Sequence, residues 1–316
     1  MKKINILKLT PIFWSTGIFI VSIVCVLLVA SRVQPFLDEK QIYLPSQPSS
    51  AVSIWPGTTT SPSGEVTQTP AISSLGPILI YFFAVIIVLG VVLFIIPLSK
   101  LKLIFKPIYA FLFGWAGFVV SILWLPLFAS IGIALVVGLY WFFYPRVWLQ
   151  SVVMVLAMVA LGAVFGRFIS PWTVMIIVAV LALYDFLAVR FGYMIWMANK
   201  LSETTALPAF VIPYRSSAWA ASLKPSVIAG IMQEKPEERK YSILGGGDIG
   251  FPLLLVASVY YSRGFDNAII VAIFSLIGLV CAYWMQASFL KGKSIPALPS
   301  IAVLSIIGLV TSNLIH

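Results

Sequence analysis

Two aspartates lie inside long apolar segments of this sequence. Asp248 falls in the run from Ile243 to Leu255, and Asp185 falls in the run from Val174 to Phe191. A carboxylate in an apolar segment of membrane-spanning length costs a few kcal/mol or more, so such residues usually serve a function. Two carboxyl groups that meet in a low-dielectric site cannot both ionise cheaply and share one proton. Such a pair can hydrolyse a peptide bond, because one carboxylate takes a proton from water while the other carboxyl polarises the peptide carbonyl.

The residues near these aspartates suit this chemistry. Three consecutive glycines, Gly245, Gly246 and Gly247, precede Asp248 and let another backbone segment approach closely. The tripeptide Pro296-Ala297-Leu298, followed by Pro299, opens the last apolar run. Proline lacks a backbone N–H and leaves a carbonyl without its helical partner. This segment is therefore expected to keep backbone groups free, and an extended substrate strand can pair with them.

The composition predicts a membrane protein. Of the 316 residues, 61% are hydrophobic and only 9% are charged, whereas about 25% of a soluble domain is charged. We expect a single polytopic membrane domain over residues 1–316. The excess of 20 Lys and Arg over 10 Asp and Glu reports orientation in such a chain rather than binding to nucleic acid. With one histidine, His316, and two cysteines, neither a metal site nor a disulfide framework is expected, and no cofactor is implied.

Hydropathy and proline positions divide the chain into nine predicted spanning helices. The segment 31–74 is rich in Pro, Ser and Thr and is predicted to be an extracytoplasmic loop, while 192–242 is predicted to be a charged cytoplasmic loop. Within the latter, Ala206 to Val211 is apolar but too short to span, which is typical of a strand or a re-entrant piece. The predicted spans cover approximately residues 11–30, 75–98, 107–124, 127–144, 147–165, 171–191, 243–261, 268–287 and 295–314.

The positive charges predict the orientation. With a cytoplasmic N-terminus and an outside C-terminus, all but four of the 20 Lys and Arg lie in cytoplasmic segments, as the positive-inside rule requires. In this arrangement Asp185 lies about six residues before the cytoplasmic end of its span, and Asp248 about five residues after the start of the next, which puts both carboxyls roughly 7 to 9 Å below the membrane boundary. We expect them to face each other across a gap that one water molecule can bridge. The four exceptions are Arg32, Lys40, Arg167 and Arg263.

In their order and depth, these motifs resemble those of the presenilin and signal peptide peptidase family of intramembrane aspartyl proteases. The resemblance covers nearly the whole chain and implies an all-α, presenilin-like bundle of nine transmembrane helices. Asp185 and Asp248 would then be the catalytic pair. Tyr184 would line the site beside Asp185, and Pro296 to Leu298 would shape the site and seat the substrate. The motifs that carry the resemblance are Tyr184-Asp185, Gly245-Gly246-Gly247-Asp248 and Pro296-Ala297-Leu298.

The resemblance also implies partners and location. The substrates would be transmembrane segments of other proteins, cut within the bilayer, and the chain would reside in the cell membrane, where a homo-oligomer is compatible with the sequence. The loop of about 50 residues between the sixth and seventh spans is shorter than expected for eukaryotic presenilins, so a microbial, archaeal member fits best. A cytoplasmic N-terminus matches the presenilin arrangement rather than that of signal peptide peptidases, which implies substrates whose N-terminus faces outward.

Two other functions are compatible with paired intramembrane aspartates. One is an ion or proton-coupled transporter or channel, in which intramembrane acids also occur. Transporters commonly show repeated halves with interrupted helices, and no convincing internal repeat is found in the sequence. The other is a prepilin-peptidase-like protease, which also uses a Gly-x-Gly-Asp aspartate but would not explain Tyr184-Asp185 or Pro296-Ala297-Leu298.

Overall fold

The described part of the chain is almost entirely helical. In this computed structural model it comprises residues 10–40, 98–190, 207–223, 240–288 and 297–314, together with the single positions 84, 88 and 91. It contains eight α-helices: α1 (Thr10–Glu39), α3 (Leu98–Ser121), α4 (Leu127–Phe143), α5 (Val147–Phe168), α6 (Pro171–Arg190), α9 (Gly246–Arg263), α10 (Phe265–Ser288) and α11 (Leu298–Leu314). The other elements are the strands β1 (Ala209–Pro213) and β2 (Tyr241–Gly245) and the 3₁₀ helix η3 (Ser216–Ala220).

Five of these helices are long and apolar enough to cross a membrane, namely α1, α3, α5, α6 and α10. Helices α4 and α11 are also apolar but have 17 residues each. At 1.5 Å per residue, such a helix is about 25 Å long, slightly less than the roughly 30 Å of a hydrocarbon core. The prediction of a mostly helical chain with several apolar helices is therefore confirmed.

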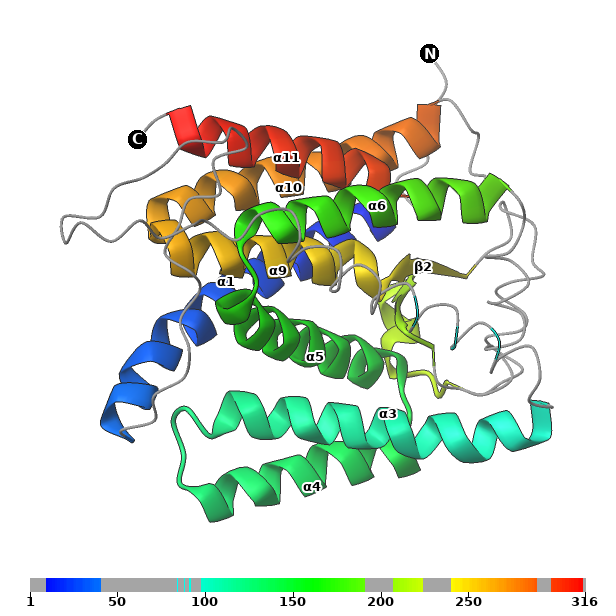
Figure 1. Ribbon diagram of the computed structural model, residues 1–316. Coiled ribbons are helices and arrows are strands. Elements are labelled where there is room, and N and C mark those ends of the chain that lie inside the picture. The colour runs from blue at the N-terminus through cyan, green and yellow to red at the C-terminus, as the bar shows by residue number, and fades with distance from the viewer. Residues whose placement is uncertain are drawn as a thin grey trace.

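Helix α9 lies in the middle of the bundle (Figure 1). It packs against α5, α10, α1, α6 and α11. Its residues Leu253, Leu255 and Val256 are fully buried. A helix with neighbours on most sides must be apolar over most of its surface, which explains the hydrophobic run in this segment. The first turn of α9, which carries Asp248, is thereby held in the interior of the bundle.

Glycines allow close contacts between the helices. A methyl group on Gly278 of α10 would lie 2.7 Å from the Cα of Ile301 in α11. A methyl group on Gly166 of α5 would lie 2.7 Å from the Cβ of Ala257 in α9. Helices in a bilayer gain little from hydrophobic burial, so their association depends on such close van der Waals packing. These contacts fix α5 against α9, and α11 against α10.

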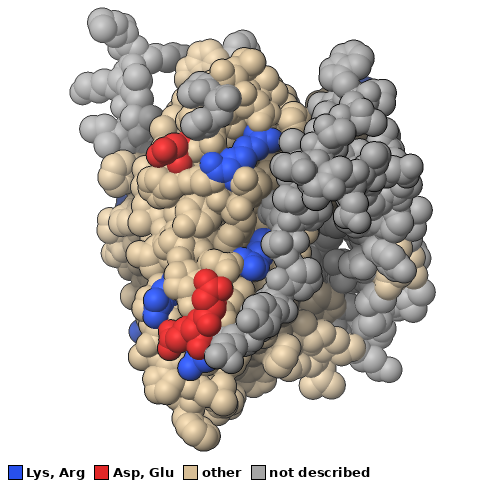
Figure 2. All heavy atoms as spheres, turned by 60° about the vertical axis from the view of Figure 1, so that its left-hand side comes forward, with Lys and Arg blue, Asp and Glu red and all other residues tan. Residues whose placement is uncertain are grey.

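The outer surface of the bundle is largely apolar. Phe128 is 86% exposed, Leu103 79% and Phe111 72%. Figure 2 shows one face on which scattered charged side chains interrupt a surface of other residues. Exposed apolar area on this scale is uncommon on water-soluble monomers, and it is typical of a surface in contact with lipid.

Two helices extend beyond their predicted limits. Helix α1 continues to Glu39 and so covers the first residues of the predicted loop 31–74. Helix α3 begins at Leu98, ahead of the predicted start at residue 107, and its first turns include Lys100, Lys102 and Lys106, which lie between two predicted spans. Lysine is a good helix former, so hydropathy alone places the start of this helix too late.

Some predicted segments lie outside the described residues. These are the span 75–98, apart from Leu98, where α3 begins, and three helical positions before it, and most of the loops 31–74 and 192–242. The number of spans is therefore not counted from the structure. The three helical positions are Ala84, Val88 and Val91.

Candidate functional site

A pair of antiparallel strands leads into the central helix α9. In the register of β1 and β2, Ala209 lies opposite Gly245 and Phe210 opposite Leu244. All five residues of β1 are buried. Because β2 ends where α9 begins, this strand pair fixes the direction in which the chain enters the helix.

The strand pair corrects two limits that were predicted from hydropathy. The segment 243–261, predicted to be one continuous span, begins as strand and becomes helical only at Gly246. The apolar segment 206–211, for which a strand or a re-entrant piece is predicted, contains part of β1, and that strand runs over residues 209–213. A strand depends on a partner elsewhere in the sequence, so the hydropathy of one segment does not distinguish it from the start of a helix.

Asp248 lies in the first turn of α9, three residues after the N-cap residue Gly245. Its carboxylate accepts a hydrogen bond from the backbone N–H of Gly245. This is half of a capping box, in which an acidic side chain reaches back to the N-cap amide. A methyl group on Gly245 would lie 3.1 Å from Oδ2 of Asp248. The Gly245 amide therefore holds the Asp248 carboxyl at the start of α9. The missing side chain at Gly245 leaves room for that carboxyl.

Asp185 lies near the C-terminal end of α6 and is half-buried. Its carboxylate accepts a hydrogen bond from the backbone N–H of Leu298, the first residue of α11. Tyr184 precedes it on the same helix and is also half-buried. Since successive residues of a helix are rotated by about 100°, the Tyr184 ring leaves α6 in a different direction from the Asp185 carboxyl.

The two aspartates belong to one site. The charge of Asp185 acts on Asp248, and the helices that carry them, α6 and α9, pack against each other. Helix α11, which supplies the Leu298 amide, packs against both. Three helices that are distant in sequence therefore converge on the two carboxyl groups.

Gly246 provides the close backbone approach that the glycine run predicts. Its N–H donates to the carbonyl oxygen of Pro208 over 2.9 Å. A methyl group on Gly246 would lie 2.9 Å from the same oxygen and 2.6 Å from Cε of Met154. At Gly247 a methyl group would meet only the ring of Phe251, at 3.2 Å. The segment before β1 is thus bound directly to the start of α9.

The Pro296-Ala297-Leu298 segment differs from its prediction. Leu298 is buried, Ala297 is half-buried, and Pro296 lies outside the described residues. The Leu298 N–H is bound to Asp185, and the Ala297 carbonyl accepts a hydrogen bond from the N–H of Ile301 over 3.3 Å. The expectation that this segment keeps its backbone groups free is wrong for these two groups, because α11 begins here and its first amide binds a carboxylate.

Gln150 of α5 was not found by sequence reasoning, although it is a lone amide in the apolar run 147–165. Its Oε1 accepts from Nε1 of Trp141 over 2.8 Å. Its Nε2 donates to the carbonyl of Leu207 over 2.9 Å and to that of Ala209 at 3.4 Å. These two carbonyls flank Pro208, whose own carbonyl binds the first residue of α9. Gln150 therefore connects α4 and α5 to the segment that positions the start of α9.

We expect the Gln150→Leu substitution to displace the start of α9 and to lower the rate of the reaction at this site about 10-fold. It leaves the Trp141 N–H and the Leu207 carbonyl buried without partners, at a cost of about 1 to 3 kcal/mol for each. The segment around Pro208 then loses its hydrogen bonds from Gln150 of α5. Initial reaction rates and thermal melting of the purified variant measure both effects. The matched control is Ser151→Ala, which removes only one long contact to Val211 at 3.5 Å; an equal loss in both variants would contradict this role for Gln150.

Tyr283 of α10 is a second residue that sequence reasoning missed. Its hydroxyl lies 2.5 Å from Oγ of Ser15 in α1, and Ser15 donates to the carbonyl of Pro11 over 2.7 Å. Tyr283 also interacts electrostatically with Asp248 and Tyr214. Helix α10 therefore also borders the Asp248 carboxyl, and the pair of hydroxyls connects it to α1.

The groups at this site suit acid–base chemistry on water. They are two carboxyl groups, each of which accepts a hydrogen bond from a backbone N–H. The hydroxyl of Tyr283 in α10 lies nearby. Within the ranges that the structure describes, no cluster of three or more His, Cys, Asp or Glu residues could hold a metal ion. Two interacting carboxyls share one proton, so one can serve as base and the other as acid.

Comparison with known proteins decides the family. The sequence profile described as "Signal-peptide peptidase, presenilin aspartyl protease" matches residues 60–316, which include both aspartates. The chain belongs to this family. No curated protein sequence matches it.

Two solved structures share the fold of this family member, and each is described as a presenilin family intramembrane aspartate protease. The one in space group C222 has a TM-score of 0.59 and 16% identity, covering 95% of this chain and 98% of that chain. The one in space group P2 has a TM-score of 0.54 and 17% identity, covering 95% and 97%.

These matches confirm the resemblance seen in the sequence. The protein is an integral membrane aspartyl protease and thus a peptide hydrolase. The prediction of an ion or proton-coupled transporter or channel receives no support from these relatives, and neither does that of a prepilin-peptidase-like protease.

Proposed function

We propose that Asp185 and Asp248 form the catalytic pair of an intramembrane endopeptidase that cuts transmembrane segments of other proteins. The observation that carries this proposal is the convergence of α6, α9 and α11 on two carboxyl groups that interact electrostatically and each hold a backbone amide. Tyr184 borders the site beside Asp185. Gly245, Gly246 and Gly247 allow close backbone contact, and Pro296, Ala297 and Leu298 shape the side of the site formed by α11.

The two carboxyl groups hydrolyse the peptide bond through one shared proton. The ionised aspartate takes a proton from water as the water oxygen attacks the peptide carbonyl carbon, and the protonated aspartate donates its proton to the carbonyl oxygen. The product of this step is a gem-diol. In the second step the aspartate that took the proton from water gives it to the amide nitrogen, while the other, now ionised, takes a proton from one hydroxyl of the gem-diol; the C–N bond breaks, and the new carboxyl and amine leave. The enzyme forms no covalent intermediate and the proton count is restored.

The strand pair offers a way to bind an unwound substrate. Each strand of a two-stranded sheet has one edge that its partner does not cover, and extended peptides bind such edges through backbone hydrogen bonds. Because β2 leads directly into the first turn of α9, a peptide paired with this sheet would run toward Asp248. Deletion of residues 209–213 should then abolish cleavage, and full activity without them would remove this part of the proposal.

The chain is further proposed to be a single domain of nine spans with a cytoplasmic N-terminus and an outside C-terminus. The distribution of Lys and Arg supports this orientation. Substrates would then enter with their N-terminus outward. The protein would reside in the cell membrane, and assembly into homo-oligomers is compatible with the sequence.

An epitope tag after residue 316 should be removed by protease added to intact cells. A tag that stays protected would contradict the orientation.

Cleavage by the purified protein tests the proposed activity. Reconstituted in lipid vesicles with a single-span substrate, the wild type should release two products cut within the apolar segment. A peptide with a hydroxyl at the scissile position mimics the gem-diol, so it should bind at least about 10²-fold more tightly than the same peptide without it. Ion flux across the vesicle membrane that depends on the aspartates, without proteolysis, would overturn the proposal.

A further inference from the structure

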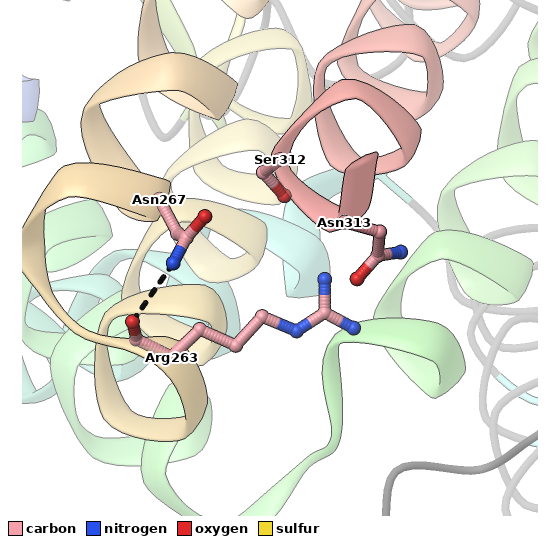
Figure 3. Close-up of a pocket in the computed structure, with 4 residues that line it drawn as sticks. All are labelled: Arg263, Asn267, Ser312 and Asn313. Atoms are coloured by element: carbon pink, nitrogen blue, oxygen red, sulfur yellow. Dashed lines mark hydrogen bonds between the residues drawn. The ribbon is translucent and has the colours of Figure 1, made fainter. Parts of the chain in front are cut away.

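A polar pocket lies at the far end of α9 from the aspartates. It has a volume of about 380 Å³ and is lined by Arg263, Asn267, Ser312 and Asn313. Arg263 is the last residue of α9, Asn267 lies in the first turn of α10, and the other two lie in the last turn of α11. Figure 3 shows the Arg263 side chain extended along this pocket, with Asn267 near its backbone end and Asn313 near its guanidinium end.

Two buried polar atoms in this pocket have no hydrogen-bond partner among the residues that the structure describes. Asn267 is only 3% exposed, and although its Nδ2 donates to the Arg263 carbonyl over 2.9 Å, its Oδ1 is unpaired. The Nη1 of Arg263 is likewise buried and unpaired. Buried polar atoms in native proteins are nearly always hydrogen-bonded, and an exception is explained by a bound water, ion or other group that completes the site, or by strain. Here that group must offer an acceptor to Arg263 and a donor to Asn267.

No side chain in the described part of the chain neutralises Arg263. Among the residues that the structure describes, the one ion pair joins Arg32 to Glu39. Arg263 rests instead over the ring of Trp172, with its guanidinium carbon 5.9 Å from the ring centre. A guanidinium with free donors binds phosphate and carboxylate oxygens in a bidentate manner. The positive charge therefore selects an anionic oxygen group.

The position of the pocket indicates where this group comes from. Asp248 and Arg263 are separated by most of the length of α9, which is about 22 Å at 1.5 Å per residue. The pocket is thus near the membrane surface opposite the one close to the aspartates, since a hydrocarbon core is about 30 Å thick. Arginines beside aromatic rings recur at this end, where Arg167 lies 5.9 Å from the ring centre of Tyr261, and such pairs are typical of the membrane interface.

We propose that this pocket binds the head group of a phospholipid in the leaflet remote from the aspartates. Its phosphate oxygens accept hydrogen bonds from Arg263 and from the Asn313 amide. A head-group hydroxyl or ammonium donates to Oδ1 of Asn267. The site therefore prefers head groups that carry a hydrogen-bond donor beyond the phosphate. It is independent of the proposed catalytic pair.

Lipid titration of the detergent-solubilised protein tests this site. Short-chain phosphatidylglycerol, which carries hydroxyls, should raise the melting temperature and appear as a bound adduct in native mass spectrometry. Phosphatidylcholine of the same chain length has the same phosphate but no donor, so it should bind about 10-fold more weakly. Glycerol phosphate has the head-group chemistry without chains, and a shift as large as that of the lipid would assign the pocket to a soluble phosphate and overturn the proposal.

Substitutions in the pocket provide the second arm of the test. Arg263→Gln should weaken phosphatidylglycerol binding at least about 10-fold, because it removes the charge-assisted hydrogen bonds. Asn267→Leu should bind phosphatidylglycerol and phosphatidylcholine alike. Arg32→Gln, which removes an arginine outside the pocket, should bind as the wild type does. Retained proteolytic activity shows that each variant is folded. Wild-type affinity in Arg263→Gln, or an unchanged lipid preference in Asn267→Leu, would overturn the proposal.

Discussion

Exchange of either Asp185 or Asp248 for asparagine should lower the cleavage rate by about 10³-fold or more, in line with the contribution of general acid–base catalysis. An asparagine keeps the size of the side chain and still accepts the backbone hydrogen bond, which comes from Leu298 at position 185 and from Gly245 at position 248. It can neither take a proton from water nor share one with its partner. The measurement is the initial rate of product formation from a single-span substrate in vesicles.

The two substitutions should not be additive. Two groups that act as one unit lose nearly all activity when either is removed, so the double variant should be no slower than the single variants. The matched control is Asp266→Asn, since this aspartate is exposed in the first turn of α10, and its cleavage rate should stay within about 2-fold of the wild type. Cleavage that persists within 10-fold of the wild type in Asp185→Asn or Asp248→Asn would end the assignment of the pair.

The features that could be predicted from the sequence are those that one segment carries by itself. A carboxylate in an apolar run is conspicuous, because its cost in a membrane makes it rare, and this singled out Asp185 and Asp248. Helix α4 covers Leu127–Phe143, close to the predicted 127–144, because Pro126 immediately precedes it and proline is disfavoured within a helix. The order of three motifs then indicated the family that the profile confirms.

The features that could not be predicted depend on partners far away in the chain. Residues 243–245 are apolar enough to be predicted as the start of the following span, and only pairing with residues 209–211 makes them a strand. The Leu298 amide was expected to stay free because nothing in its own segment shows that a carboxylate from α6 accepts its hydrogen bond. Gln150 was visible as a polar residue in an apolar run, but its partners on α4 and before β1 appear only in the fold.

The Gly278→Ala substitution tests whether the packing of α11 sets the geometry of the aspartates. The added methyl group would lie 2.7 Å from the Cα of Ile301 and 3.1 Å from the carbonyl oxygen of Ser300, and both are backbone atoms that cannot rotate away. Helix α11 must therefore shift away from α10. Its first residue, Leu298, donates to Asp185, so the shift moves this amide and the carboxyl that it holds.

We expect this single methyl group to lower the cleavage rate by up to about 10²-fold, because a displacement near 1 Å in an active site costs that much. Overpacking of this kind also destabilises by about 1 to 3 kcal/mol, which thermal melting measures. The control is Gly132→Ala on α4, where an added methyl group meets nothing within 4 Å. Both substitutions raise helix propensity equally, so any difference between them comes from the contact with α11. If Gly278→Ala cleaves as fast as Gly132→Ala, the Leu298 amide does not depend on this packing, and the coupling between α11 and Asp185 is absent.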